Sequence, residues 1–163
     1  MMTTGTLTVT TPSDREICMT RAFDAPSDLV FDALTRPELL KRWLGVQNGW
    51  TLEVCAIDLR VGGSYVYDWR RGTKQMIMRG TYREIVRPAR IVTTEQFDDP
   101  WYEGEAISTL TLTADGNRTT MATTVCYDTR AIRDNVLKSG MERGVATSYD
   151  RLDEVLRSSA PVR

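Results

Sequence analysis

The sequence contains no histidine, and this absence removes most of the common catalytic and metal sites. Ser-His-Asp and Cys-His arrangements are excluded, and so are histidine-ligated zinc and non-haem iron sites. Acid–base chemistry would have to come from Asp, Glu, Lys, Tyr or Cys side chains. Neither G-x-G-x-x-G nor G-x-x-x-x-G-K-[ST] occurs, so no motif supports nucleotide binding. We expect no cofactor and no metal.

Cysteine is also scarce, which bears on the cellular compartment of the protein and on whether it contains disulfide bonds. Cys18, Cys55 and Cys126 lie far apart, and none forms a CxxC pair. An odd number of cysteines at such spacings argues against a disulfide framework. We interpret all three as small, buried or half-buried apolar side chains.

Neither sign of charge dominates, and long apolar runs are missing. Lys and Arg total 21 against 22 Asp and Glu, a net charge of -1, and the basic residues are scattered. A nucleic-acid partner is therefore not expected. No apolar run approaches the roughly 18 residues of a membrane span, and the first residues lack the pattern of a secretory signal. We expect a cytoplasmic protein.

What remains is the composition of one globular domain. Of the 163 residues, 41% are hydrophobic and 26% are charged. A chain of this size can bury about 70% of its unfolded surface without a metal or a disulfide. We place a single domain at residues 14–159, after a Thr-rich, flexible lead at residues 1–13.

Alternation of apolar and polar side chains predicts strands along most of the chain. The first strand covers residues 15–24. Residues 50–127 contain six more, separated by turn signals such as Gly62-Gly63 and Asp115-Gly116. Strands this close in sequence are expected to pair antiparallel.

Two short helices are predicted between the first strand and the other six. Pro26 ends the strand, and Ser27 or Asp28 is expected to cap the first helix. The second helix begins with Pro37 in its first turn, and Thr35 or Arg36 is expected at its cap.

Residues 131–158 predict one long helix, because they contain neither proline nor alternation. Its length would be about 40 Å, enough to cross a sheet. Its apolar side comprises Val136 or Leu137, Met141, Val145, Ser148, Leu152, and Val155 or Leu156. Because a sheet with one apolar face must be covered, we predict an α+β fold in which a curved antiparallel sheet wraps this helix around a partly apolar cavity.

Four ordered motifs identify the chain as similar to a known family. They are RAFDAPSDLVFDALTRPELLKRWLG, DLRVGGSY, GTYREIVRPARIVTTEQF and GMERGVATSYDRLDEVL. Together they resemble the bacterial branch of the START-like (SRPBCC) superfamily, in the family that resembles the C-terminal domain of the activator of heat-shock-protein-90 ATPase. The resemblance covers about residues 15–156.

The resemblance implies a helix-grip fold of six or seven antiparallel strands around a long C-terminal helix. It also implies binding of a hydrophobic or amphipathic small molecule, with cyclase or dehydratase enzymes in the same superfamily as one alternative. A module that regulates a chaperone ATPase is another alternative. Eukaryotic activators carry an additional chaperone-docking domain to which nothing in this sequence corresponds, so a chaperone partner is not expected. Whether the chain forms a homodimer stays open.

One position departs from the family pattern. In the pattern that the resemblance implies, many relatives carry tryptophan after the glycine of the GM-x-x-G motif, where this chain has Val145 after Gly144. If the position faces the sheet, the smaller side chain enlarges the cavity, unless other aromatic residues fill the space.

Aromatic residues supply the first candidates for a ligand site. Tyr65, Tyr67 and Trp69 alternate along one strand, so they share one face and form either core packing or a pocket wall. Tyr82 and Trp43 leave the same two interpretations open. Trp101 lies in a loop near acidic residues, where it could cover the cavity mouth.

Glu95 is the candidate acid or base. It shares a strand face with Ile91, Thr93 and Phe97. Facing inward it would have a raised pKa and act as a general base or ligand anchor, whereas facing outward it would be solvated or paired with an arginine. The rarity of buried carboxylates favours the outward orientation. No residue is assigned as catalytic.

Two other motifs have mainly structural interpretations. Asp58 and Arg60 flank the Gly62-Gly63 bend and suit a turn with a local ion pair. Gly140 and Gly144 would either allow a close helix–sheet approach or leave room for a ligand. The candidate ligand-binding residues are Trp43, Tyr67, Trp69, Tyr82, Glu95, Phe97, Trp101, Met141, Val145 and Ser148.

Overall fold

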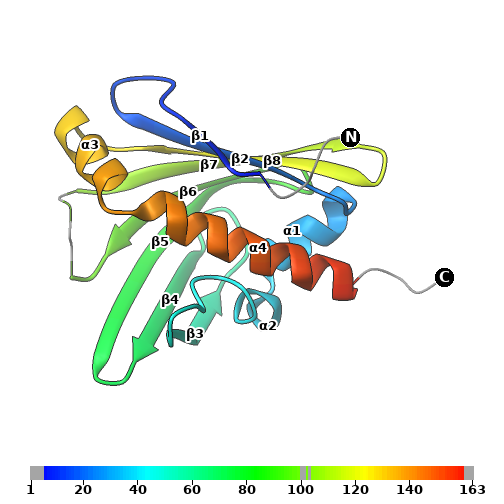
Figure 1. The fold of residues 1–163 in the computed structure, drawn as a ribbon, viewed down its shortest axis with the longest axis horizontal. Helices are drawn as coiled ribbons and strands as arrows, with labels where there is room; N and C mark the ends of the chain where they lie inside the picture. The colour runs from blue at the N-terminus through cyan, green and yellow to red at the C-terminus, as the bar shows by residue number, and fades with distance from the viewer. Residues whose placement is uncertain (1–5, 100–101, 103, 160–163) are drawn as a thin grey trace.

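One antiparallel sheet dominates the computed structural model, which describes residues 6–99, 102 and 104–159 (Figure 1). Its spatial order is β1-β2-β8-β7-β6-β5-β4-β3. The strands are β1 (Thr8–Thr10), β2 (Glu16–Phe23), β3 (Thr51–Ile57), β4 (Ser64–Arg71), β5 (Lys74–Val86), β6 (Arg90–Phe97), β7 (Ala106–Asp115) and β8 (Arg118–Cys126). The predicted α+β class is confirmed, with 8 strands in place of the expected six or seven.

The additional strand is β1, which lies inside the segment expected to be a flexible lead. Thr8 pairs with Thr20 and Thr10 with Cys18, so this short strand forms one edge of the sheet. Its Thr-Val-Thr sequence has the β-branched character that favours a strand. The expectation is therefore wrong for Thr8–Thr10, while residues 1–5 lie outside the described part of the chain.

The sheet bends strongly, and its helices gather on the concave side (Figure 1). Strand pairing is irregular in the half of the sheet that bends away from the rest. The register shifts between Leu52 and Val54 in β3, and between Tyr82 and Glu84 in β5. Bulges of this kind bend a strand and increase its local twist. The result is a hollow on the side that carries the helices.

Two short helices follow β2, as predicted: α1 (Ser27–Thr35) and α2 (Pro37–Leu40). Pro37 occupies the start of α2 and Arg36 its cap position, as predicted, whereas the predicted Ser27 or Asp28 cap of α1 is wrong. Pro26 is the cap residue of α1, and the Ser27 hydroxyl instead lies 3.1 Å from that of Thr119 in the core. The Thr35 hydroxyl donates to the carbonyl of Phe31.

The predicted single C-terminal helix is two helices, α3 (Arg130–Lys138) and α4 (Met141–Ser159). Gly140 separates them with a φ of 83°, a left-handed conformation that glycine adopts without the steric cost of a side chain. Only α4 therefore crosses the concave side of the sheet (Figure 1). Within the described ranges, none of the helices combines the length and apolarity needed to cross a membrane.

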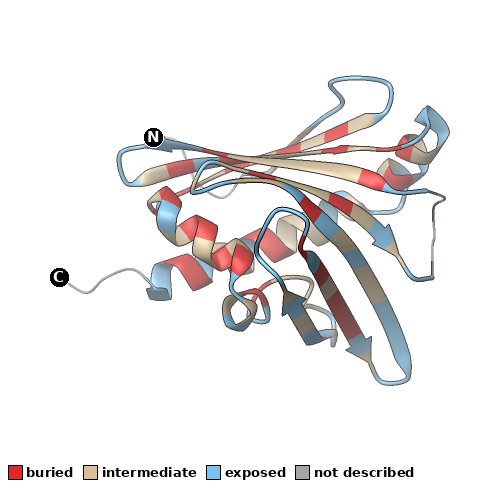
Figure 2. Cartoon of the chain, turned by 180° about the vertical axis from the view of Figure 1, so that it is seen from behind, coloured by how far each residue is buried: buried red, intermediate tan, exposed pale blue. Residues whose placement is uncertain are grey.

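All of the buried residues of α4 lie from Ser148 onwards, towards its C-terminal end (Figure 2). They are Ser148, Tyr149, Leu152, Val155 and Leu156. In the N-terminal half, Met141 and Val145 are only half-buried. The helix is therefore packed tightly over α1 and the adjoining sheet at one end and spans open space at the other.

An ion pair fixes the packed end of α4 to the sheet. Arg21, on β2, is 3% exposed, and its Nη1 lies 2.9 Å from Oδ1 of Asp150. The same guanidinium lies over the ring of Phe23, 4.9 Å from its centroid. A buried arginine held in this way specifies where the helix crosses β2.

Gly140 and Gly144 give a matched test of the helix break. Gly140→Ala should lower the free energy of unfolding by about 1 kcal/mol or more, since a Cβ is unfavourable at its positive φ. Gly144→Ala should raise it by up to about 1 kcal/mol, because this glycine lies inside α4. Its added Cβ would meet only Gln47 Nε2, at 3.8 Å. Urea unfolding of both variants measures the difference, and effects of the same sign would contradict the break at Gly140.

Candidate functional site

A cavity of about 500 Å³ lies between α4 and the concave face of the sheet. Its lining comes from strands β2 and β4 to β8, from α1 and α2 with the loop that follows, and from α4. Most of the lining is apolar, and five methionines contribute to it: Met19, Met76, Met78, Met121 and Met141. Methionine side chains adapt to irregular shapes, so this wall suits a ligand that does not match it rigidly.

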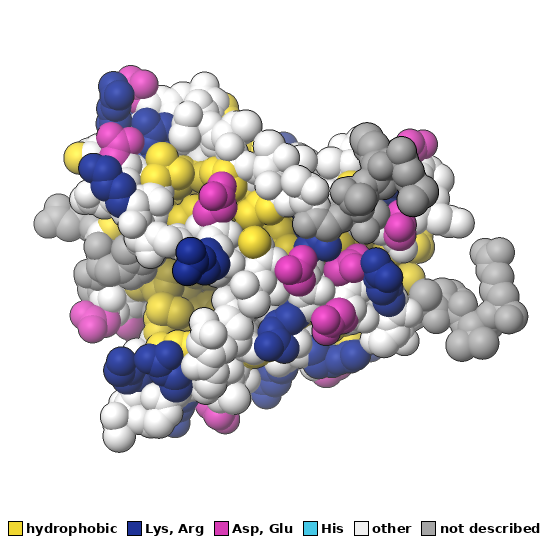
Figure 3. Space-filling model, in the orientation of Figure 1, with side chains coloured by type: hydrophobic (Ala, Val, Ile, Leu, Met, Phe, Trp, Pro, Cys, Tyr) yellow, Lys and Arg dark blue, Asp and Glu magenta, His cyan; other side chains and the backbone are white. Residues whose placement is uncertain are grey.

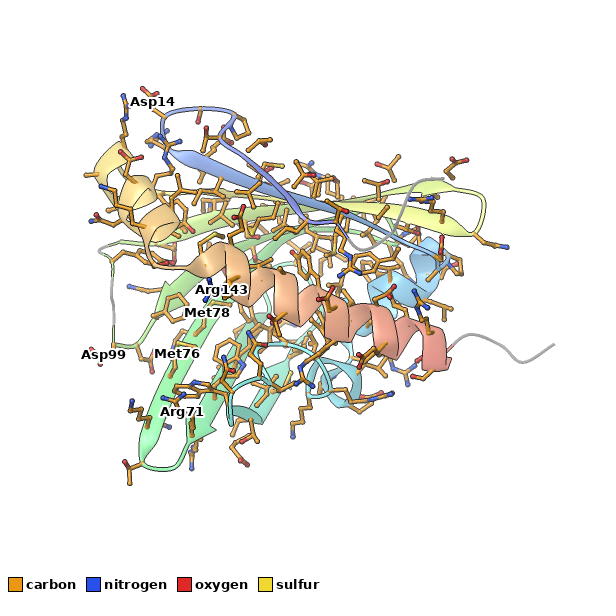
Figure 4. The ribbon with its side chains drawn as sticks, in the orientation of Figure 1. Asp14, Arg71, Met76, Met78, Asp99 and Arg143 are labelled. Carbon is orange, nitrogen blue, oxygen red and sulfur yellow. The ribbon has the colours of Figure 1, made fainter. Side chains whose placement is uncertain are left out.

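The cavity opens between the N-terminal half of α4 and β5. Met76 is 39% exposed and also lines the cavity, which places it at the mouth. Figure 4 shows Met76 and Met78 on β5, beside the part of α4 that carries Arg143. Figure 3 shows apolar surface in the same region, next to basic side chains.

Tyrosines form the aromatic wall of the cavity. Tyr65 and Tyr67 lie on the same face of β4 with ring centroids 4.8 Å apart, and Tyr82 of β5 lies 5.7 Å from Tyr65. The Tyr65 hydroxyl donates to the Thr94 carbonyl at 2.7 Å. Gly80 makes this approach feasible, because a Cβ there would lie 2.6 Å from the Tyr65 ring. The predicted shared face is thus the inner face of the sheet.

Two tryptophans hold the segment around α2 in place. The Trp69 indole donates to the Leu44 carbonyl at 2.8 Å, and that of Trp43 donates to Ala33 at 2.9 Å. A Cβ at Gly45 would lie 2.6 Å from Trp69 Nε1, so glycine is required beneath the indole. Trp43 also lines the cavity, whereas Trp69 does not.

Glu95 faces into the cavity, together with Ile91, Thr93 and Phe97 from the same strand. The favoured outward orientation is therefore wrong. The Tyr102 hydroxyl donates to Glu95 Oε1 at 3.3 Å. Burial raises the pKa of Glu95, and the hydrogen bond from Tyr102 opposes this increase only in part. Among the described residues that line the cavity, none is a lysine or arginine that could neutralise the carboxylate.

Two hydroxyl groups in the wall are available to a ligand. Tyr67 and Tyr82 both line the cavity, and no described residue accepts or donates a hydrogen bond at either hydroxyl. Burial raises the pKa of both phenols above the ordinary value, so they remain neutral donors at physiological pH. Burial also raises the pKa of the nearby Cys55 thiol to about 11, which keeps it protonated and unreactive.

Another part of the lining is a polar cluster formed where the loop after α2 contacts α4. The Ser148 hydroxyl donates to Gln47 Oε1 at 3.1 Å and accepts from the Gly45 amide at 3.2 Å. Gln47 Nε2 donates to the Gly144 carbonyl at 3.1 Å. These bonds tie the loop after α2 to Gly144 and Ser148 of α4, and their polar atoms are already paired.

The cavity brings together most of the predicted ligand-binding residues. Those that line it are Trp43, Tyr67, Tyr82, Glu95, Phe97, Met141, Val145 and Ser148. Trp69 packs behind the lining, and Trp101 lies outside the described residues. Gln47, Met76 and Met78 also line the cavity but are not among the predicted residues. Met76 and Met78 are separated from Tyr82 by even numbers of residues along β5, so the two-residue period of a strand places all three on one face.

Comparisons with known proteins agree with this architecture. A crystal structure of a protein from Rhodobacter sphaeroides superposes with a TM-score of 0.87 at 27% identity, covering 94% of this chain and 100% of that one. A protein from Chromobacterium violaceum gives a TM-score of 0.73 at 26% identity, over 88% and 98% of the two chains. One from Mycobacterium smegmatis, at 19% identity and a TM-score of 0.82 over 95% and 100%, shares the fold.

No curated protein matches the chain. A family match nevertheless spans most of its length. Residues 24–157, from the end of β2 almost to the end of α4, match the family described as Activator of Hsp90 ATPase homolog 1-like protein. The matched range includes nearly the whole cavity wall, with Met19 as the exception. The chain therefore belongs to the Activator of Hsp90 ATPase homolog 1-like family.

Proposed function

We propose that the protein binds a small, largely apolar molecule in the cavity between α4 and the sheet. The observation that carries this proposal is the cavity itself, about 500 Å³ with a mostly apolar lining that opens to the surface beside Met76. Ligand sites are typically of this size and combine apolar walls with a few polar groups. Of the partners considered from the sequence, a small molecule is the one that the cavity supports.

The polar groups that would orient such a ligand are few and close together. Tyr67 and Tyr82 offer hydroxyl groups that form no hydrogen bond with another described residue, and Glu95 of the same lining offers a carboxyl group. The Gln47–Ser148 cluster is already hydrogen-bonded internally, so it would shape the wall more than bind. Polar recognition is thus expected at the β4–β6 side of the cavity.

A neutral solvatochromic dye tests occupancy of the cavity. Nile red should bind with 1:1 stoichiometry, and its emission should shift to shorter wavelength because the dye moves from water to apolar surroundings. Val145→Trp should weaken this binding at least tenfold, since Val145 lines the cavity and an indole would occupy it. Fluorescence titration measures both affinities.

Glu142→Trp is the matched control, because Glu142 is exposed on the same helix and does not line the cavity. It should bind the dye as the wild type does. Equal dye affinity in Val145→Trp and wild type would show that the dye binds elsewhere and would remove this support for the proposal.

Glu95 should cost stability at neutral pH, which its replacement can measure. Its pKa is raised in the folded protein, so the folded state binds a proton more tightly than the unfolded state. Stability therefore falls as pH rises from the ordinary glutamate range through the raised pKa. Glu95→Gln should melt at a higher temperature than wild type at pH 8, and the difference should shrink towards pH 4.

The exposed helix residue Glu154 provides the control for this experiment. Glu154→Gln should change the free energy of unfolding by no more than about 0.5 kcal/mol, as is usual for surface substitutions. A Glu95→Gln variant that is less stable than wild type at pH 8 would mean that the carboxylate is stabilised by its surroundings, against our interpretation.

Catalysis in the same cavity is a second candidate, because Glu95, Tyr67 and Tyr82 all line it. In a dehydration, the Glu95 carboxylate would take the proton next to a ketone and a tyrosine would protonate the departing hydroxyl, which leaves as water. Incubation with an aromatic β-hydroxyketone should then produce enone absorbance that Glu95→Gln abolishes. Absorbance that rises equally with both proteins, or not at all, argues against this candidate.

A further inference from the structure

We propose that the preferred ligand is a lipophilic amine, whose ammonium group pairs with Glu95 between the tyrosine rings of the cavity. This inference rests on the proposed binding function and adds the chemical class of the ligand. It depends on two observations: the charge composition of the described lining, in which Glu95 has no basic neighbour, and the aromatic faces of that lining.

The lining contains one carboxylate and no opposite charge. Among the described residues that line the cavity, Glu95 is the only acid, and no lysine or arginine is present. The hydrogen bond that Glu95 receives from a described residue comes from a neutral hydroxyl, that of Tyr102, at 3.3 Å. A carboxylate in apolar surroundings gains most from a cation, so the cavity is electrostatically complementary to a positively charged group.

The aromatic wall strengthens the same preference. The rings of Tyr65, Tyr67 and Tyr82 form one cluster, with centroids 4.8 and 5.7 Å apart, and this cluster lines the cavity together with Glu95. Aromatic faces attract cations through the ring quadrupole, and they do so more strongly when water is excluded. An ammonium group would therefore meet a carboxylate and aromatic faces at once, while its hydrocarbon part contacts the methionines.

The same arrangement disfavours fatty acids and other anionic lipids. A ligand carboxylate inside the cavity would lie near Glu95 without a basic side chain in the described lining. Like charges at short range in apolar surroundings repel strongly. Arg143 is exposed on α4 beside the mouth and does not line the cavity, so it does not reverse this preference (Figure 4).

The groups that face Glu95 do not titrate near neutral pH. They are the tyrosine hydroxyls of Tyr65 and Tyr67 from β4, Tyr102 from the loop before β7, and Tyr127 after β8. Burial raises the pKa of each of these phenols, so all four stay neutral. Glu95 alone should govern the pH dependence, and amine binding should weaken as pH falls and the carboxylate becomes protonated.

Three probes with one carbon skeleton test the inference: naphthylmethylamine, naphthylmethanol and naphthoate. Calorimetric titration at pH 7.5 should show the amine binding at least tenfold more tightly than the alcohol, with naphthoate the weakest. At pH 5 the preference for the amine should shrink. In Glu95→Gln the amine and the alcohol should bind with similar affinity, whereas Glu154→Gln should keep the tenfold preference.

Failure of this inference can be distinguished from failure of the proposed function. If Nile red and the alcohol bind but the amine is no tighter, the amine preference is overturned and the binding function stands. The assignment to Glu95 is overturned if the preference survives in Glu95→Gln. If the dye and all three probes fail to bind, the proposed function falls, and the ligand class falls with it.

Discussion

The cavity depends on α4 being held firmly at one end only. The buried guanidinium of Arg21 pairs with Asp150, and Tyr149, Leu152 and Leu156 pack beneath the same half of the helix. All residues from Met141 to Thr147 are half-buried or exposed. A helix that packed evenly along its length would close the hollow. Its uneven packing leaves a space that side chains of the described residues do not fill.

The helix break at Gly140 sets the position of this open end. A continuous helix from α3 would have carried residues 130–138 along the axis of α4, across or beyond the edge of the sheet. Because Gly140 adopts a φ of 83°, α3 turns aside and its Val136 packs in a separate cluster with Ile17 and Val125. The first turns of α4 are thereby left beside β5, where the cavity opens.

Much of the architecture follows from the sequence because it depends on periodicity. Alternation gave the strands and placed Tyr65, Tyr67 and Trp69 on one face, and the predicted ion pair of Asp58 and Arg60 forms at 2.9 Å. Periodicity does not report what a hydroxyl or indole will meet across the fold. Trp69 therefore looked equivalent to Tyr67, although its indole binds the backbone of Leu44, while the Tyr67 hydroxyl has no partner among the described residues.

The incorrect predictions relied on average preferences of residue types, such as helix propensity and the general rarity of buried carboxylates. Residues 131–158 are mostly good helix formers, and their average preference concealed a single position where glycine ends one helix before the next begins. The strand Thr8–Thr10 escapes prediction because a three-residue edge strand has almost no sequence pattern of its own. The outward orientation of Glu95 followed the general rarity of buried carboxylates, and that average cannot anticipate a hollow or the hydroxyl of Tyr102 from a distant loop.

The inward orientation of Glu95 is informative because it lowers the stability of the folded protein. A carboxylate on an inner sheet face, with a raised pKa and no basic residue in the described lining, is less favourable for folding than an amide or an apolar side chain of similar size. Positions where local chemistry opposes stability are those where a functional requirement is expected. Asp68 shows the contrast: it lies on the aromatic strand β4 itself, between Tyr67 and Trp69, but its carboxylate is hydrogen-bonded by Arg70 and Gln75, and these bonds lower its pKa. The chain thus pairs the buried carboxylate on the outer side of β4 and leaves the one inside the cavity without a cation, which is the arrangement expected if a ligand supplies it.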